Sequence, residues 1–182
     1  MEQTRLLRSH RSVRRYAPTP IPDDVLMDVV DTARWTGSAK NLQPWQVVVV
    51  RDPALRQGLS TCGAFAEHLA GAPAVIAIVM DDQRWAFDCG RIAQQIQLAA
   101  WAHGVGSCIG TINPEHEARA KELLGVPADR WLRQTIALGY PADARAHRFA
   151  EEPEKGTRAG LALGRKPMNE FASFDRFGNR SA

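Results

Sequence analysis

APAVIAIVMDD, Ala72 to Asp82, decides the fold. The stretch is a run of apolar and β-branched residues that stops at two aspartates. A short apolar run without polar interruptions is typical of a strand that is buried on both faces. WQVVVVRDP, Trp45 to Pro53, repeats the pattern and predicts a second buried strand that a turn stops. The two stretches predict a sheet at the centre of the protein.

Two later stretches extend the expected sheet. VGSCIGTI, Val105 to Ile112, is a third strand candidate, and its glycines allow another segment to lie against the backbone. WLRQTIALGYP, Trp131 to Pro141, alternates at first and then becomes continuously apolar, which predicts a fourth strand. Residues after Tyr140 are too poor in apolar side chains to form a core of their own.

Helical patterns lie between the expected strands. Pro22 and the two aspartates after it open a helix, because proline suits a first turn and acidic side chains complement its positive end. Residues 86–103 form a long alanine-rich helical pattern that stops at Gly104. A further helix is expected over residues 113–124, with Gly125 as its stop. Strands that alternate with helices predict three layers with the sheet in the middle.

The size and composition indicate one soluble globular domain. The chain has 182 residues, of which 45% are apolar and 24% are charged. It contains neither the roughly 18 consecutive apolar residues that a bilayer crossing needs nor a recognisable secretory signal. Its cysteines, Cys62, Cys89 and Cys108, lack CxxC spacing, so neither a disulfide framework nor a zinc site is indicated. We expect a cytoplasmic protein without a membrane partner.

Positive charge gathers at the two ends of the chain, although the formal net charge is only +3. The basic residues of the ends are Arg5, Arg8, Arg11, Arg14 and Arg15, and then Lys155, Arg158, Arg165, Lys166, Arg176 and Arg180. In SHRSVRRYAPTPIPDD, Ser9 to Asp24, Val13 and Tyr16 interrupt the charges, which indicates a segment packed on one side. The planar guanidinium of arginine meets phosphate oxygens two at a time, and Ser12 adds a hydroxyl. One phosphate suits this tight group better than a long nucleic-acid track.

Residues 104–110 contain patterns that resemble a dinucleotide-binding site and a nucleophile elbow. Their glycines follow a helix, whereas a dinucleotide fingerprint follows a strand and opens a helix, which argues against a Rossmann site. The same residues place Cys108 in a Gly-x-Cys-x-Gly pattern, as in a nucleophile elbow, but Asn113-Pro114 delays the helix that an elbow requires. A hydrolase that uses Cys108 is therefore a weaker alternative, and a basic nucleic-acid-binding module is another.

No metal site is expected. Glu115-His116-Glu117 lacks the i, i+4 histidine pair of a zinc helix. Asp81-Asp82 is typical of the turn that follows a strand. Solvated surface accounts for both groups.

Three signatures, in this order, resemble the nitroreductase family of FMN-dependent oxidoreductases. The first joins HRSVRRY (residues 10–16) to PIPDDVL (residues 20–26), and the second is TGSAKNLQPWQVVVV (residues 36–50). The third combines HGVGSCIG (residues 103–110), IALGYP (residues 136–141) and GRKPMNEF (residues 164–171). The similarity extends over roughly residues 6 to 177, and the joint order and spacing of the signatures carry it.

The resemblance implies an α+β fold, a three-layer α/β/α sandwich with a central mixed sheet, in an intertwined homodimer. Residues 1–182 would form one domain, whose C-terminal arm, from about residue 141, embraces the partner subunit. Two FMN molecules would lie in the subunit interface, each touched by both chains. The alanine face of the 86–103 helix would then be the dimer seam.

The resemblance also implies a cofactor site. Its residues would be His10, Arg11, Ser12, Arg14, Asn41, Gln43, Gly106, Ser107, Arg165 and Lys166. By the family pattern, Arg11, Ser12 and Arg14 would hold the phosphate and ribityl chain, and Arg165 and Lys166 would close on the phosphate from the tail. Asn41 and Gln43 would hydrogen-bond the flavin, and Gly106 and Ser107 would place backbone donors near the ring. Arg14 would also stabilise the negative charge of reduced flavin at N1 and O2.

Two positions depart from the family pattern. His10 stands where members usually carry a second arginine, which predicts a weaker or pH-dependent grip on the phosphate. Gly37-Ser38 stands where members usually carry Pro-Ser, which loosens the loop before Asn41. Lys40, beside that loop, either faces the substrate opening or is a solvated lysine.

The function that the resemblance implies is transfer of hydride from NAD(P)H, through FMN, to an electron-poor acceptor such as a nitroaromatic, quinone or enone. The protein would supply no catalytic nucleophile, because the flavin carries the chemistry. A flavin-dependent dehydrogenase or dehalogenase on the same fold is an alternative. The large lid insertion that usually accompanies such roles has little room in 182 residues.

Overall fold

The computed structural model describes residues 2–143, 157–158, 161–162 and 167–180. The described α-helices are α1 (Glu2–Ser9), α2 (Asp23–Arg34), α3 (Pro53–Ser60), α4 (Ala86–Ala102), α5 (Glu117–Leu124) and α7 (Met168–Phe171). The strands are β1 (Trp45–Val50), β2 (Ala74–Met80), β3 (Gly106–Thr111), β4 (Trp131–Gly139), β5 (Thr157–Arg158) and β6 (Leu161–Ala162). None of the helices in this described part is both long and apolar enough to cross a membrane.

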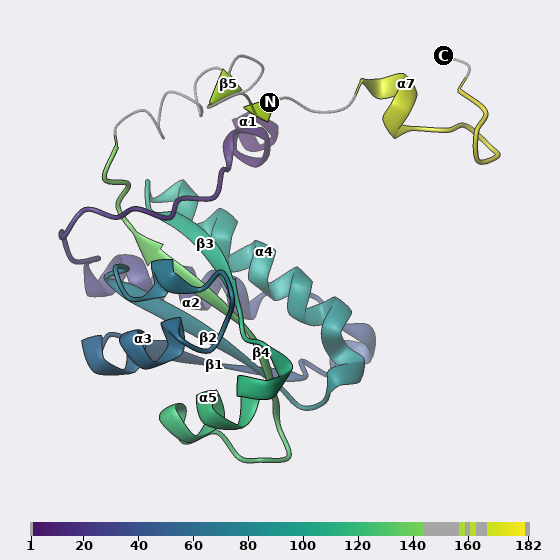
Figure 1. Ribbon diagram of the computed structural model, residues 1–182. Coiled ribbons are helices and arrows are strands. Elements are labelled where there is room, and N and C mark those ends of the chain that lie inside the picture. Colours follow the sequence, from purple (N-terminus) through teal and green to yellow (C-terminus); the bar gives the residue numbers. More distant parts are fainter. Residues whose placement is uncertain (1, 144–156, 159–160, 163–166, 181–182) are drawn as a thin grey trace.

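Four of the strands form one sheet in the order β1-β2-β4-β3 (Figure 1). Every ladder in this sheet is antiparallel. The sequence predicted these four strands correctly, but the expected mixed sheet differs from the one observed. Among the described residues, parallel pairing occurs only as an isolated bridge between Ser12 and Ser107, beside β3.

The sheet is the middle of three layers, as expected for an α+β sandwich. β2 is buried along its whole length because it is a central strand with helices over both faces. Ile76, Ile78 and Met80 join the core with α2 and α4, whereas Val75 and Val79 join the core with α3 and α5. Alternate side chains of one strand therefore tie the two helical layers together.

β1 is an edge strand rather than the buried strand that its sequence predicted. Trp45, Val47 and Val48 are half-buried and Val49 is 37% exposed, whereas Val50, at the end of the strand, is buried. The run of four valines cannot show this difference, because edge position depends on which strands pair. The outer edge of β1 has no ladder partner among the described residues.

α4 packs its alanines inward, which corrects the expected dimer seam. Ala93, Ala99 and Ala100 are buried in the core that this helix shares with α2 and the sheet. The other face of α4 exposes Phe87, of which 80% is accessible, and Gly90. The alanine face is therefore occupied by the chain's own core, and any subunit seam along α4 lies on its other face.

α3 is a helix that the sequence reading missed. Asp52 caps its N-terminus: its Oδ1 accepts hydrogen bonds from the backbone N–H groups of Ala54, at 2.7 Å, and Leu55, at 3.1 Å. Pro53 occupies the first turn, where a proline costs no hydrogen bond. The two residues taken as the stop of a strand are also the start of a helix.

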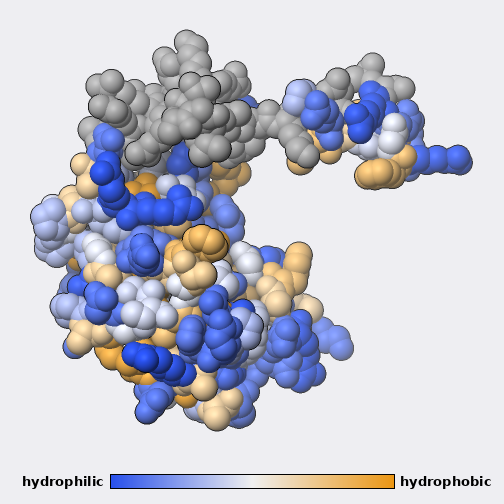
Figure 2. All heavy atoms as spheres, viewed as in Figure 1, coloured by the Kyte–Doolittle hydropathy of each residue, from blue (hydrophilic) through white to orange (hydrophobic). Residues whose placement is uncertain are grey.

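The described C-terminal tail, residues 167–180, presents apolar side chains to solvent. Figure 1 shows α7 standing away from the sandwich, and Figure 2 shows apolar surface on this segment. Met168, Phe171, Phe174 and Phe177 are all at least half exposed. Exposed apolar side chains gathered on one segment are typical of an interaction surface.

Replacing Asp52 by alanine should destabilise the fold by about 1 kcal/mol, because two backbone donors of α3 lose their acceptor. Asp52→Asn should retain most of the stability, since an amide oxygen also caps. Urea unfolding measures both variants. Equal losses in the two variants would contradict capping as the role of Asp52.

Candidate functional site

The N-terminal strap, defined as residues 10–16, lies along the start of β3. Its Val13 N–H donates to the carbonyl oxygen of Ser107 at 2.8 Å, and Ser12 forms the parallel bridge to Ser107. The Val13 side chain is buried against Gly106, where a Cβ atom would approach Cγ2 of Val13 to 2.7 Å. Gly106 is thus the position that allows the strap to reach the sheet.

Tyr16 secures the other end of the strap. Its hydroxyl donates to the Val13 carbonyl oxygen at 2.5 Å, and its backbone bridges to Pro141. The next residue, Ala17, donates its N–H to the carbonyl oxygen of Tyr140 at 2.8 Å. Burial is the largest cause of the raised pKa of Tyr16, so the phenol keeps its proton as a donor. The expectation that Val13 and Tyr16 pack the segment on one side is confirmed.

Clamping one side of the strap leaves a polar side exposed. Ser12 and Arg14 alternate with the buried Val13 and are both exposed. The Arg11 guanidinium folds back, and its Nη1 donates to the carbonyl oxygens of Arg8 and His10, both at 2.7 Å. The strap therefore presents a hydroxyl and a guanidinium from fixed backbone positions.

His10 is the first residue of the strap, and its ring contacts Trp101 of α4. Its Nε2 is 3.3 Å from the Ser107 hydroxyl, and its ring meets that of Trp101 edge-on at a centroid distance of 6.0 Å. Burial, and secondarily the charge of Arg11, lower the pKa of His10 below its ordinary value. His10 is therefore neutral at neutral pH and does not reproduce the fixed positive charge of an arginine there.

Gly106 and Ser107 are both buried beneath the strap. Gly106 accommodates the Val13 side chain, and the Ser107 carbonyl oxygen accepts a hydrogen bond from the strap. That either also places a backbone donor near a flavin ring stays a prediction. Arg165 and Lys166 lie outside the described residues.

Cys108 has the surroundings of an inert buried thiol. Burial raises its pKa. The charge of the Arg14 guanidinium and side-chain hydrogen bonds with Ser12 and Arg14 oppose that rise only in part. An unactivated thiol is a poor nucleophile. Among the described residues, no group of three or more His, Cys, Asp and Glu side chains could hold a metal ion.

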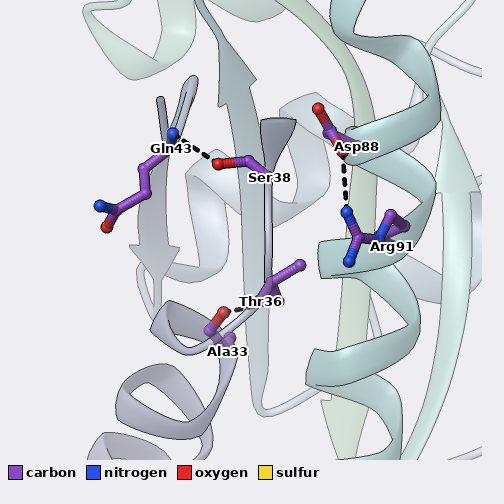
Figure 3. Close-up of polar contacts among 6 residues, drawn as sticks. All are labelled: Ala33, Thr36, Ser38, Gln43, Asp88 and Arg91. Atoms are coloured by element: carbon purple, nitrogen blue, oxygen red, sulfur yellow. Dashed lines mark hydrogen bonds and ion pairs between the residues drawn. The ribbon is translucent and has the colours of Figure 1, made fainter. Parts of the chain in front are cut away.

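The loop of residues 36–43 holds the other expected ring-binding residues, Asn41 and Gln43, of which Figure 3 shows Gln43. The Gln43 N–H donates to the Ser38 hydroxyl oxygen at 2.8 Å, which closes the loop. Lys40, Asn41 and Gln43 have positive φ angles of 52°, 54° and 48°. All three side chains are exposed, so their amide and ammonium groups point away from the core.

A groove of about 640 Å³ opens between this loop and the first half of α4. Trp35, Gly37, Phe87, Arg91 and Gln94 are among the residues that line it. Arg91 pairs with Asp88 in the same helix, Nη1 to Oδ1, at 3.3 Å (Figure 3). The sequence reading missed this pair, whose only signal was the i, i+3 spacing of an acid and a base.

The strap and the loop lie at opposite corners of the sheet. β1 begins directly after the loop, and its Trp45 pairs with Met80 at the end of β2. The strap contacts Ser107, which is level with Ala74 at the start of β2 through Leu138. The edges are three strand spacings apart, about 14 Å, and the levels differ by about 20 Å along β2. Within one chain, the two groups of expected site residues are therefore far apart.

The comparisons with known proteins agree with this architecture. The model of the nitroreductase family matches residues 7–84 and 60–140, which include the strap, the loop and all four strands of the sheet. The chain belongs to the nitroreductase family. The tail from residue 141 lies beyond the matched region, so the roles expected for Arg165 and Lys166 stay predictions.

This nitroreductase-family chain is similar in sequence or in fold to several individual proteins. A Thermus thermophilus protein named NADH dehydrogenase is 29% identical, and the match covers 73% of this chain and 83% of the relative. The structure of an FMN-dependent nitroreductase from Clostridium difficile superposes with a TM-score of 0.73 at 27% identity, covering 77% of this chain and 88% of the other. A Vibrio harveyi NADPH:FMN oxidoreductase, solved with NAD⁺, shares the fold over 98% of this chain and 79% of its own, with a TM-score of 0.78 and 21% identity.

Replacing Gly106 by alanine should destabilise this nitroreductase-family chain by about 1–3 kcal/mol, because the added methyl group overpacks against Val13. Gly71→Ala is the matched control, since a Cβ there has no neighbour within 4 Å. Urea unfolding of both variants measures the difference. If Gly106→Ala is as stable as the control, the strap does not depend on contact with Gly106.

His10 should make stability depend on pH. Its folded pKa lies below its unfolded value, so the unfolded chain binds a proton first and stability falls as the pH drops below about 6.5. His10→Gln keeps an amide for Ser107 but cannot titrate, so it should lose less unfolding free energy between about pH 7.5 and about pH 5.5. Urea unfolding at both values tests this. His68, whose pKa burial also lowers, is present in both proteins and cancels in the comparison.

Proposed function

We propose that this chain is an FMN-dependent oxidoreductase that takes hydride from NAD(P)H and passes it to an electron-poor acceptor such as a nitroaromatic, quinone or enone. Membership of the nitroreductase family supports the reaction class. So does a Vibrio harveyi relative named NADPH-flavin oxidoreductase, 26% identical over 73% of this chain. The observation that carries the proposal is the strap, which buries Val13 against β3 and leaves Ser12 and Arg14 exposed together.

The exposed groups fit the anionic half of FMN. A guanidinium supplies paired N–H donors for phosphate or for a flavin edge, and a serine hydroxyl supplies one more donor. Their backbone is held by the Ser107 and Tyr16 hydrogen bonds, so little conformational freedom remains to be lost on binding. We assign the phosphate and ribityl contacts to Arg11, Ser12 and Arg14, with Arg165 and Lys166 closing from the tail. Arg11 would have to turn from its backbone acceptors to meet the phosphate.

When bound, FMN supplies the hydride-accepting and hydride-donating chemistry. The chain would hold and polarise the ring. Arg14 would place a fixed positive charge where reduction leaves negative charge. Asn41 and Gln43 carry amides that both donate and accept, as the edge of a flavin requires. No side chain of this chain needs to act as a nucleophile.

We further propose a homodimer in which each flavin is shared. The strap and the loop of one chain are diagonal across the sheet, so a ligand that touches both groups needs the loop of a second chain. The exposed face of α4 at Phe87 and Gly90, beside the loop, is the surface that we assign to the seam. The exposed apolar residues of the tail support a C-terminal arm, from about residue 141, that embraces the partner within one 182-residue domain.

The alternatives have less support from the structure. The buried thiol of Cys108, with its raised pKa, does not favour a hydrolase. The strap presents a compact group rather than the extended basic track that nucleic acid requires. The names of the relatives give no support to a dehalogenase. The name NADH dehydrogenase, which the Thermus thermophilus relative carries, describes oxidation of NADH, which is the first half of the proposed reaction. A cytoplasmic location stays a prediction from the sequence.

The purified protein should be yellow, or become so with added FMN, and NADPH or NADH should bleach it until an acceptor is added. Arg14→Ala should weaken FMN binding at least about tenfold, because a charge-assisted contact is lost. Arg15→Ala, the exposed arginine next to it, is the control. A protein that stays colourless with excess FMN would refute the proposal.

Shared sites predict complementation. Arg14→Ala and Asn41→Ala should each impair both sites of their own homodimer. After unfolding and refolding an equal mixture, half the dimers are mixed and each has one intact site, so about a quarter of all sites should recover. Flavin titration of the mixture counts these sites. No recovery above the separate variants would mean that one chain supplies both residues.

A further inference from the structure

The loop of residues 36–43 holds a backbone conformation that its sequence does not favour. Lys40, Asn41 and Gln43 adopt positive φ without being glycine. This backbone conformation is unfavourable for a residue that has a Cβ atom, and it persists only where the surroundings enforce it. Three such residues within four positions require contacts that keep the loop in this conformation.

Two hydrogen bonds of the loop residues supply part of this stabilisation. The Ser38 hydroxyl accepts from Gln43 N–H, and the Thr36 hydroxyl donates to the Ala33 carbonyl oxygen at 2.7 Å (Figure 3). The second bond ties the start of the loop to the end of α2. Neither bond fixes the loop relative to α4, which forms the opposite wall of the groove.

Arg91 of α4 contacts the loop at Gly37. Its Nη2 lies 3.0 Å from the position that a Cβ atom on Gly37 would occupy, so the guanidinium rests on the Gly37 backbone. Gly37 is not needed for its backbone angle, because its φ is not in the left-handed region. A methyl group at this position would therefore require the Arg91 guanidinium to shift.

Asp88 holds Arg91 in place. Only 9% of the Asp88 side chain is exposed, against 43% of Arg91, and the two are joined by the 3.3 Å contact. A carboxylate this deeply buried is costly without a charged partner. The pair therefore fixes the guanidinium from the helix side, and the guanidinium contacts the loop on its other side.

We propose that Asp88 and Arg91 are positioning residues that hold the 36–43 loop, and with it Asn41 and Gln43, in the conformation that meets the flavin ring. The Asp88–Arg91–Gly37 contact acts as a latch between α4 and the loop. The inference about the flavin rests on the proposed function. The inference about the loop does not, because it concerns only contacts within the chain.

Trypsin tests the latch without any flavin, since Lys40 is an exposed cleavage site within the loop. Arg91→Gln should speed cleavage after Lys40 by at least about tenfold, because the strained loop opens more often. Lys121→Gln, which breaks the helical pair between Lys121 and Glu117 on α5, is the matched control and should leave the rate at Lys40 unchanged. Cleavage after Arg176 in the tail serves as an internal standard.

A double-mutant cycle tests the contact itself. Gly37→Ala should displace the guanidinium and weaken FMN binding several-fold, as should Arg91→Gln, and each should shift the visible absorption band of bound FMN. The double variant should be no weaker than the worse single variant, because both changes remove one contact. Asp88→Asn with Arg91→Gln tests folding separately, since it leaves no unpaired charge, and its circular dichroism should match that of the wild type.

The outcomes distinguish the proposed latch from its proposed effect on flavin binding. Unchanged cleavage at Lys40 in Arg91→Gln would overturn the latch, whether or not the protein binds FMN. Faster cleavage with unchanged FMN affinity and spectrum would overturn the link from the latch to the flavin. Additive losses in the cycle would show that Gly37 and Arg91 act independently, which also overturns the latch. A wild-type protein without FMN affinity would refute the proposed function and the link to the flavin, while the cleavage rates still decide the latch.

Discussion

The docking of the strap onto β3 is the contact on which the candidate site depends. A glycine at position 106 lets Val13 reach the sheet, and one backbone hydrogen bond to Ser107 sets the register of the segment. Because an extended chain alternates its side chains, burying Val13 exposes Ser12 and Arg14. A single apolar contact thus converts a basic terminus into an ordered group of donors.

The antiparallel sheet then sets the distance between this group and the loop that precedes β1. The strap lies at the start of β3, which is one edge strand, and the loop precedes β1, which is the opposite edge strand. A site that uses both requires two chains, so the sheet order explains why catalysis and assembly would be linked in this family member. The strained loop, which Arg91 contacts from α4, is the part of each chain that would complete the other's site.

Much of the fold was predictable because periodicity reports burial. The β-branched run of β2, the stops at Gly104 and Gly125 and the helix start after Pro22 all act locally, and the structure confirms them. α3 was missed although Asp52 and Pro53 signalled it, because a strand stop and a helix start share the same residues. The alanines of α4 were assigned to a seam, yet small residues permit close packing against any neighbour, and here the neighbour is α2 and the sheet.

The sequence by itself determined the four strands of the sheet, the helices α2, α4 and α5, the three layers and the identity of the donors in the strap, since these follow from side-chain spacing and chemistry. Only the tertiary structure decided that β1 is an edge, that His10 turns toward Trp101, and that Arg91 rests on Gly37. Each of these depends on which segments meet across long stretches of chain. A local pattern can report that a residue is apolar or charged, but the partner that it meets is set by packing.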